Sequence, residues 1–258
     1  MDNFIRKLYW LLSSQFGIDL RRMLRSFKGI PRFLIDLIKF RKNYTGKLNL
    51  LPCLHDWYEE GGSTKNEYFL QDLYVAQQIH MVNPEKHVDV GSRIDGFVAH
   101  VASYREIEVF DIRQVTSSIL RVIFRQADLM NPSNIFVDYC DSLSCLHALE
   151  HFGLGRYGDP LNALGYVAGF ENIAKILKKN GLLYLSVPVG IERVEFNANR
   201  VFDPETIVKL AMLNDLSLKS FAFVGTTRTL TESRNPEVDM SQLSTQDYAL
   251  GIFTFIKE

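Results

Sequence analysis

Two residues in the middle of the chain have the types and the spacing of a nucleoside-binding pair. Gly91 follows a predicted strand at 87–90, and Asp111 ends a second predicted strand 20 residues after it. A glycine at a strand-to-helix turn lets main-chain N–H groups approach a ligand, and an acid at the end of the next strand can accept both hydroxyls of a ribose. The pair therefore predicts a nucleoside site, with a tight turn and a solvated aspartate as the alternative.

The literal pattern G-x-G-x-x-G occurs elsewhere, at 153–158. A nucleotide fingerprint requires a strand before this pattern, whereas here a predicted helix precedes it, so we do not interpret it as one. We expect 153–160 to form a flexible loop over the site. Its candidate contacts to a substrate are Arg156, Tyr157 and Asp159.

Strands and helices alternate in this part of the chain, which is typical of a parallel sheet. A helix over 68–82 leads into it. We expect seven strands, at 87–90, 107–110, 122–125, 140–145, 182–189, 216–224 and 248–256. We expect helices between them at 95–102, 169–179 and 204–213. The sequence therefore predicts one α/β domain over 67–258.

The beginning of the chain differs in charge and in periodicity. Residues 1–47 hold eleven Lys or Arg and three Asp, which leaves 18 basic and 27 acidic residues for 48–258. Apolar side chains recur at spacings of three and four up to residue 42, which predicts amphipathic helices broken at Gly17 and at 29–31. Such helices suit an anionic membrane surface, and equally a cap on the core or a protein partner. We assign 1–66 to a basic helical extension with a linker.

The composition limits the cellular location and the classes of partner that we expect. The three cysteines are few and odd in number, which argues against a disulfide scaffold and favours a reducing compartment, so we expect a cytoplasmic location. No apolar run reaches the roughly 18 residues of a membrane span, and 8–14 is too short for the core of a signal peptide. The acidic part has no basic stripe with interleaved aromatic residues, so nucleic acid is not an expected partner.

Five segments resemble, in their order and spacing, the motifs of class I S-adenosylmethionine-dependent methyltransferases. They are VDVGS at 88–92, VFD at 109–111, QAD at 126–128, DSLSCLHALEH at 141–151 and ILKKNGLLYLSVP at 176–188. More narrowly, the stretch 142–160 is similar to an uncharacterised methyltransferase-like family with members in nematodes and in bacterial surface-polysaccharide gene clusters. The resemblance implies a Rossmann-like fold, with a seven-stranded, mostly parallel sheet and helices on both of its faces, and S-adenosylmethionine as cofactor.

The resemblance also implies positions for the cofactor. The methionine end would contact the turn after the first strand, made of Asp89, Val90, Gly91, Ser92, Arg93, Asp95 and Gly96. The ribose would bind at Asp111 and Ile112, the adenine at Asp128 and Leu129, and Ser144 would lie beside the sulfur. Arg93 departs from the pattern, because it stands where the family has its second glycine.

Methyl transfer to a hydroxyl needs alignment and often a base. His151 is the first candidate, because it lies just beyond the fourth strand and imidazole titrates near neutral pH. Glu150 and Asp159 are candidates to orient it or to bind acceptor hydroxyls. The alternative is that His147 and His151 lie one turn apart on a helix and only pack or cap it.

Further candidate contacts to a substrate are His147, beside the base, and Glu195, Asn197 and Arg200, in a polar loop over 188–200. An ordinary surface loop is the alternative for that segment. Cys140, Cys145, His147 and His151 are ligand types for zinc, but the two cysteines are an odd number of residues apart and face opposite sides of a strand. We therefore expect no metal.

The sequence thus favours an S-adenosylmethionine-dependent methyltransferase that methylates a hydroxyl, on a sugar in surface glycan biosynthesis. The substrate class follows from the resemblance alone. The alternative is a catalytically inactive relative that serves as a scaffold in a glycan-assembly complex, with Arg93 marking a lost pocket. A nucleotide-dependent oxidoreductase is less favoured, because no full glycine fingerprint follows the first strand.

Overall fold

A computed structural model describes residues 3–62, 64, 66–131 and 136–258. The chain divides into two compact units, Met1–Ser63 and Thr64–Glu258. Among the described helices, none is long and apolar enough to cross a membrane. The separate roles expected for 1–66 and 67–258 stay predictions.

The first unit consists of two α-helices and a short 3-10 turn. Helix α1 spans Asn3–Gln15, α2 spans Leu20–Asn43, and η1 spans Asp56–Tyr58. The predicted break at Gly17 is present, with a positive φ of 70°. The predicted break at 29–31 is wrong, because α2 runs through it. A proline removes one N–H donor, and a long helix can continue past it with that one hydrogen bond missing. Gly29 has a packing role here.

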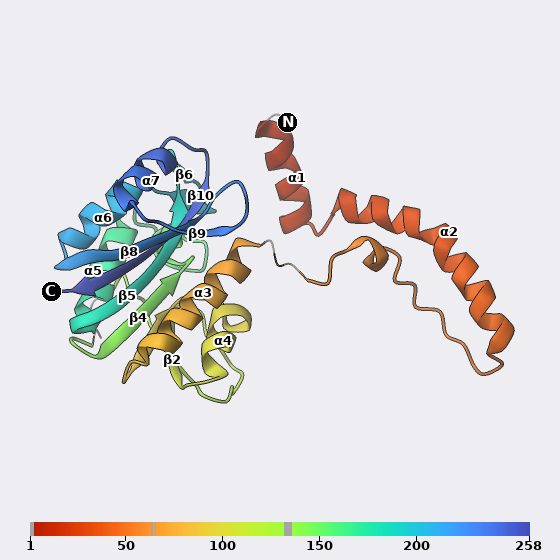
Figure 1. Cartoon of the computed structure of the whole chain (residues 1–258), viewed down its shortest axis with the longest axis horizontal. Coiled ribbons are helices and arrows are strands. Elements are labelled where there is room, and N and C mark those ends of the chain that lie inside the picture. The colour runs from red at the N-terminus through yellow and green to blue at the C-terminus, as the bar shows by residue number, and fades with distance from the viewer. Residues whose placement is uncertain (1–2, 63, 65, 132–135) are drawn as a thin grey trace. The chain divides into compact units, whose positions relative to one another are not determined.

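The second unit is built on an eight-stranded sheet (Figure 1). Its order is β3-β2-β1-β4-β5-β10-β8-β9, and the ladders from β3 to β5 are parallel. Strand β10 is antiparallel to both of its neighbours. The strands are β1 His87–Val90, β2 Ile107–Asp111, β3 Val122–Gln126, β4 Cys140–Leu146, β5 Leu177–Val189, β8 Leu216–Val224, β9 Leu230–Glu232 and β10 Ala249–Lys257.

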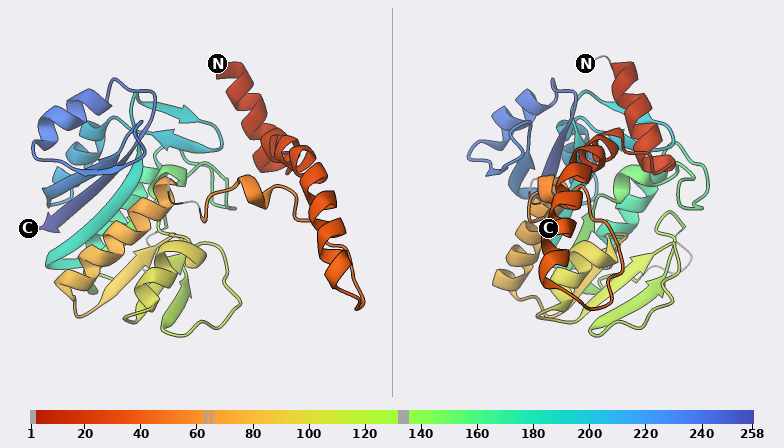
Figure 2. Two further views of the ribbon diagram at one scale, coloured as in Figure 1. Left: turned by 45° about the vertical axis from the view of Figure 1, so that its right-hand side comes forward. Right: turned by 90° about the vertical axis from the view of Figure 1, so that its right-hand side faces the viewer.

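Helices cover both faces of this sheet (Figures 1 and 2). One face packs on α3 Glu67–Val82, the turn Ile94–Val98 and α4 Ala99–Ala102, through residues such as Val75, Phe97 and Val101. The other packs on α5 Gly165–Ile176, α6 Pro204–Met212 and α7 Pro236–Leu243, through residues such as Phe170, Ile207 and Met240. This confirms the predicted Rossmann-like architecture.

The structure adds elements that the sequence did not indicate. Strand β9 extends the sheet edge, and the segment expected as a polar loop contains a hairpin of β6 Arg193–Glu195 and β7 Asn199–Val201. Strands of three residues are too short to show a period. Helix α5 lies earlier than predicted, and β5 begins at Leu177, with a register shift against β4 near Cys140.

Candidate functional site

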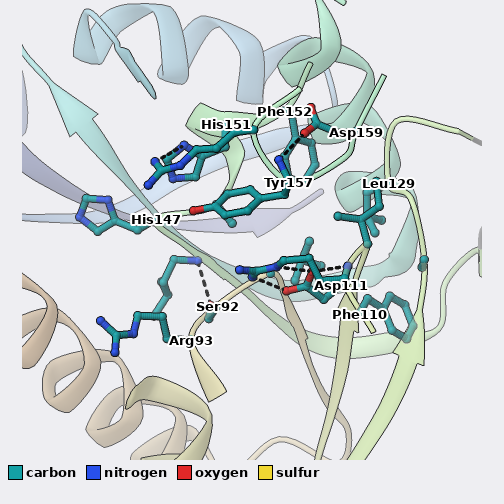
Figure 3. A pocket seen from close by; sticks show the side chains of 18 of the residues that line it. Ser92, Arg93, Phe110, Asp111, Leu129, His147, His151, Phe152, Tyr157 and Asp159 are labelled. Atoms are coloured by element: carbon teal, nitrogen blue, oxygen red, sulfur yellow. Dashed lines mark hydrogen bonds and ion pairs between the residues drawn. The ribbon is translucent and has the colours of Figure 1, made fainter. Parts of the chain in front are cut away.

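A cavity lies at the carboxyl ends of the parallel strands, against the first half of α3 (Figure 3). This is the edge at which doubly wound sheets bind ligands. Most of the predicted site residues line it, namely Val90, Gly91, Ser92, Arg93, Asp111, Ile112, Asp128, Leu129, His147, His151, Arg156, Tyr157 and Asp159. The structure therefore brings Gly91 and Asp111 into one cavity.

The turn after β1 requires glycine at position 91. Its φ is 71°, and a Cβ there would lie 2.9 Å from the Cβ of Ala148, which follows β4. Its N–H donates to the carbonyl of Phe110 at 2.9 Å, which holds the end of β1 beside the end of β2. The lack of a side chain thus allows three strand ends to converge.

Beneath this turn, Asp89 organises a buried network. Its carboxylate is fully buried and accepts from Ser92 Oγ and Ser144 Oγ, both at 2.6 Å, and from Ser92 N–H at 3.0 Å. Ser144 in turn lies 3.1 Å from Nε2 of His87. Burial raises the pKa of Asp89 to about 7, although the hydrogen bonds from the serines lower it. Asp89 and Ser144 therefore hold the turn from behind and do not line the cavity.

Arg93 does not fill the cavity. Its guanidinium donates to both carboxylate oxygens of Asp95, at 3.1 and 2.7 Å, and its side chain is 61% exposed. Figure 3 shows this guanidinium pointing away from Asp111. Asp95 and Gly96 lie outside the lining, and a Cβ at Gly96 would lie 2.7 Å from a carboxylate oxygen of Asp72. Glycine at 96 is thus needed for contact with α3.

Asp111 is held by Arg113, a lining residue that the sequence did not single out. Asp111 Oδ1 accepts from the N–H and the Nε of Arg113 at 2.8 and 3.0 Å, and Oδ2 accepts from Nη2 at 2.6 Å. The hydrogen bonds to Asp111 raise the pKa of Arg113. The guanidinium also lies over the ring of Tyr157, 4.4 Å from its centroid. Arg113 therefore links the strand end to the loop across the cavity.

The glycine-rich loop folds around its own carboxylate. Asp159 accepts from the N–H groups of Gly153 at 2.8 Å, Gly155 at 3.1 Å and Tyr157 at 3.1 Å. The loop follows the 3-10 turn Leu149–His151 and not a strand. The amides that would bind a phosphate in a nucleotide fingerprint are thus occupied. Of the two roles predicted for Asp159, orienting His151 or binding acceptor hydroxyls, the first has no hydrogen bond to support it among the described residues, because both carboxylate oxygens accept from the main chain of the loop.

A buried carboxylate holds His147. Glu150 is fully buried, and its Oε1 lies 2.8 Å from Nδ1 of His147. Burial would raise the pKa of Glu150, but the charge of His151 and the hydrogen bond with His147 lower it. Burial would lower the pKa of His147, yet the hydrogen bond and charge of Glu150 raise it. Because a carboxylate only accepts, Nδ1 of His147 carries the proton.

The other ring nitrogen of His147 faces a second carboxylate at a longer distance, since Nε2 lies 3.9 Å from Oε1 of Glu67. His147 Nε2 is buried and has no hydrogen-bond partner among the described residues. The ring packs against Tyr68 in a tilted arrangement, with centroids 4.5 Å apart and an interplanar angle of 36°. The main chain adopts a φ of 50°, a sparsely populated conformation for a residue other than glycine. His147 and His151 therefore do not lie one turn apart on a helix, which was the alternative considered from the sequence.

His151 is held in a different way. Its Nδ1 donates to the carbonyl of Ala198 at 2.7 Å, and its Nε2 lies 3.6 Å from Glu150 Oε1. Burial lowers the pKa of His151, the charge of Glu150 raises it, and Arg156 lowers it further. Arg156 also donates to the Ala198 carbonyl, at 2.8 Å. The two ring nitrogens of His151 thus face a main-chain carbonyl and a buried carboxylate.

The residues predicted from the segment 188–200 lie outside the lining. Glu195 accepts from Arg193 at 2.8 Å within the β6–β7 hairpin, and Asn197 is in its turn. Arg200 is buried and donates to the carbonyls of Glu150, Phe152 and Ala163 at 3.2, 2.6 and 3.1 Å. Arg200 was predicted to contact a substrate, whereas in the structure it fixes the main chain around Glu150.

Sequence reasoning missed the side of the cavity formed by α3. Tyr68, Gln71 and Asp72 line it, and Gln71 and Asp72 are buried. Burial raises the pKa of Asp72. The signal was present, because Gln71 and Asp72 interrupt the apolar face of an otherwise ordinary amphipathic helix.

The candidate zinc ligands do not come together. Among the described residues, His55, Asp56 and Glu59 form the one group of ligating side chains close enough for a metal ion, and all three lie outside the cavity. All three cysteines are free. Burial raises the pKa of Cys140 to about 12, which disfavours the thiolate that zinc requires.

The strand order and the placement of the cavity define a class I methyltransferase-like fold. The structure is similar to 1,6-didemethyltoxoflavin-N1-methyltransferase from Burkholderia thailandensis, with bound 1,6-didemethyltoxoflavin and S-adenosylhomocysteine, at a TM-score of 0.51, 12% identity and coverage of 89% and 90% of the two chains. It is also similar to the [4+2]-cyclase SpnF, at a TM-score of 0.50 and 14% identity, with coverage of 71% of this chain and 80% of that one. At these identities the comparison establishes the fold alone.

The chain belongs to the family described as Caenorhabditis protein of unknown function, DUF268, which matches residues 97–250. This confirms the nematode family suggested by the stretch 142–160. The association with bacterial polysaccharide genes stays a prediction. A comparison with curated proteins gives no match.

Asp89→Asn should change how stability depends on pH. With a folded-state pKa of about 7 against 3.8, the folded chain binds more protons between these values, so the Asp89 contribution to the free energy of unfolding falls as pH rises through this window. The slope is at most about 1.4 kcal/mol per pH unit. Urea unfolding of both proteins from pH 4 to pH 7 measures the difference. Parallel curves would show that Asp89 does not titrate there.

Proposed function

We propose that the cavity binds S-adenosylmethionine and that the protein transfers its methyl group to a hydroxyl of a small molecule. The observation that carries this proposal is the convergence of the Gly91 turn and the Asp111 carboxylate on one cavity. When bound, the cofactor supplies an electrophilic methyl group on a sulfonium. The protein then has to align the acceptor and remove its proton.

The lining fits this cofactor from one end to the other. The turn at Gly91 and Ser92 lets a ligand approach the main chain closely, and Arg93 lies at its rim. Asp111 suits the ribose, and apolar side chains beyond it suit a flat base, namely Phe110, Ile112 and Leu129. Asp128 accepts from the N–H of Met130 at 2.9 Å, which shapes the loop at the adenine end. The roles of Asp89 and Ser144 would be indirect.

We propose His147 as the base, in place of the His151 expected from the sequence. Its Nδ1 is fixed by Glu150, which is the arrangement in which a carboxylate orients an imidazole base, and its Nε2 makes no hydrogen bond among the described residues and lies 3.9 Å from Oε1 of Glu67. Proton transfer would run from the acceptor hydroxyl to this nitrogen, and the anionic Glu150 would stabilise the imidazolium that forms. His151 has its Nδ1 engaged with a carbonyl and its Nε2 directed at Glu150.

The acceptor side is polar. Tyr68, Gln71 and Asp72 face it from α3, with Arg156 and Tyr157 from the loop. Such groups suit hydroxyls, and the proposal of a sugar in surface glycan biosynthesis adds the family resemblance to this chemistry. Three free cysteines fit the proposed cytoplasmic location.

The inactive scaffold remains the second candidate, and one observation favours it. Arg113 occupies the carboxylate of Asp111 through both oxygens. A ribose would have to share or displace this ion pair. Cofactor binding separates the two candidates, because a scaffold without a pocket would release no heat with S-adenosylmethionine.

Asp111→Ala should weaken S-adenosylmethionine binding at least tenfold, about 1.4 kcal/mol, because the carboxylate that holds the ribose hydroxyls is lost. Isothermal titration calorimetry measures this. The matched control is Asp36→Ala, an exposed aspartate of α2 that should leave affinity unchanged. Equal affinity in Asp111→Ala and wild type would remove Asp111 from the site.

His147→Asn should lower the rate of methyl transfer by roughly 10²-fold or more, with S-adenosylmethionine affinity unchanged. In the wild type the rate should rise with pH through the raised pKa of His147, because the base acts when neutral. Glu150→Gln removes the charge that raises this pKa, so the rise should move to lower pH. Labelled S-adenosylmethionine with a panel of free and nucleotide-linked sugars provides the assay.

His151→Asn is the matched comparison, since both imidazoles contact the same carboxylate. It should retain most of the rate. A loss confined to His151→Asn would return the base to the residue that the sequence indicated.

A further inference from the structure

Helix α2 carries a bare apolar stripe. Side chains at spacings of three and four are 46–69% exposed, namely Leu20, Met23, Leu24, Phe27, Leu34, Ile35 and Ile38. At 3.6 residues per turn they fall on one face of the helix over five turns. An exposed apolar surface that is continuous over such a length marks an interaction site.

The first unit packs its own chain on the opposite face of this helix. Gly29, the one buried residue of α2, lies so close to the main chain at Leu54 that a Cβ would meet the Leu54 carbonyl oxygen at 1.9 Å. Tyr58 donates to the carbonyl of Lys28 at 3.3 Å, and the guanidinium of Arg32 lies over the ring of Trp57. The segment 54–58 therefore covers the side of α2 opposite the stripe, and among the described residues of this unit the stripe stays exposed.

Cations border the stripe along its length. Helix α2 holds eight Lys or Arg and one acid, Asp36, a net charge of +7 by this count. At about 100° per residue, Arg21, Arg25, Lys28, Arg32 and Lys39 form a row along one edge of the stripe. A long apolar strip beside a row of cations is the pattern of a helix that lies in a membrane interface.

We propose that α2 docks this stripe on an anionic lipid surface. The apolar side chains enter the boundary between headgroups and acyl chains, and the bordering cations attract the headgroups. A lipid plane offers negative charge along the whole helix, which matches the length of the row. A second copy of α2 is disfavoured as the occupant, because two helices of like charge would repel each other. This inference stands independently of the proposed activity.

The test is co-sedimentation of the full chain with vesicles of phosphatidylcholine, with and without phosphatidylglycerol. The wild type should bind the anionic vesicles and release them at high salt. Phe27→Gln should weaken binding by roughly tenfold or more, because an apolar side chain on the stripe is lost. The matched control is Phe40→Gln, an equally exposed phenylalanine that lies off the stripe and should retain binding.

Replacing Arg21, Arg25 and Lys39 by Gln should abolish the preference for anionic vesicles while circular dichroism stays unchanged. If the wild type bound neutral and anionic vesicles equally well, the proposed preference for an anionic surface would be overturned. If the wild type bound neither kind of vesicle, the proposal that α2 docks on a membrane would be overturned. If sedimentation velocity showed a dimer that Phe27→Gln dissociates, the stripe would instead bind a second copy of the chain.

Discussion

The site depends on the close approach of the turn after β1 to the residues after β4. Gly91 makes the approach possible, because any Cβ would collide with Ala148. Asp89 secures it from below, since one buried carboxylate joins Ser92 of the turn to Ser144 of β4. A buried polar network of this kind rigidifies what it connects when its members are satisfied. This network therefore fixes the cavity wall formed by the turn after β1. Asp89 and Ser144 can shape the site in this way without contacting a ligand.

The fold could be predicted from the sequence because its signals are local. Short apolar runs that end in polar residues mark parallel strands, and the carboxyl ends of such strands meet at one edge whatever the details of packing. Gly91 and Asp111 are brought together for that reason alone. Elements with weak local signals were missed, as β9 and α7 show. The continuity of α2 through Pro31 was missed because glycine and proline are local signals of a helix end, and such signals do not show whether a long helix continues with one N–H donor fewer.

The hydrogen-bond partners of the site could not be predicted in the same way. Glu150 is predicted from the sequence to orient His151 or to bind acceptor hydroxyls, and in the structure its hydrogen bond goes to His147 while His151 lies farther away, at 3.6 Å. Asp159 and Arg200 were chosen as polar residues near a site, and both are engaged with main-chain groups of the loop. A polar side chain near a cavity can bind a ligand or form hydrogen bonds within the protein. The sequence alone does not reveal which of the two a given side chain does.

The two similar structures carry a further consequence. One is an N1-methyltransferase and the other a [4+2]-cyclase, so one fold accommodates different reactions. What distinguishes chains of this fold must then lie in the residues beyond the strand ends. Here those residues are a buried Glu150 that fixes one imidazole nitrogen of His147, and a loop folded around Asp159 that carries Tyr157 between Arg113 and Arg156. The other nitrogen of His147 makes no hydrogen bond among the described residues and lies 3.9 Å from Glu67, so this imidazole stands between two carboxylates. Two carboxylates beside one imidazole favour its protonated form, which is the electrostatic condition that a proton acceptor needs.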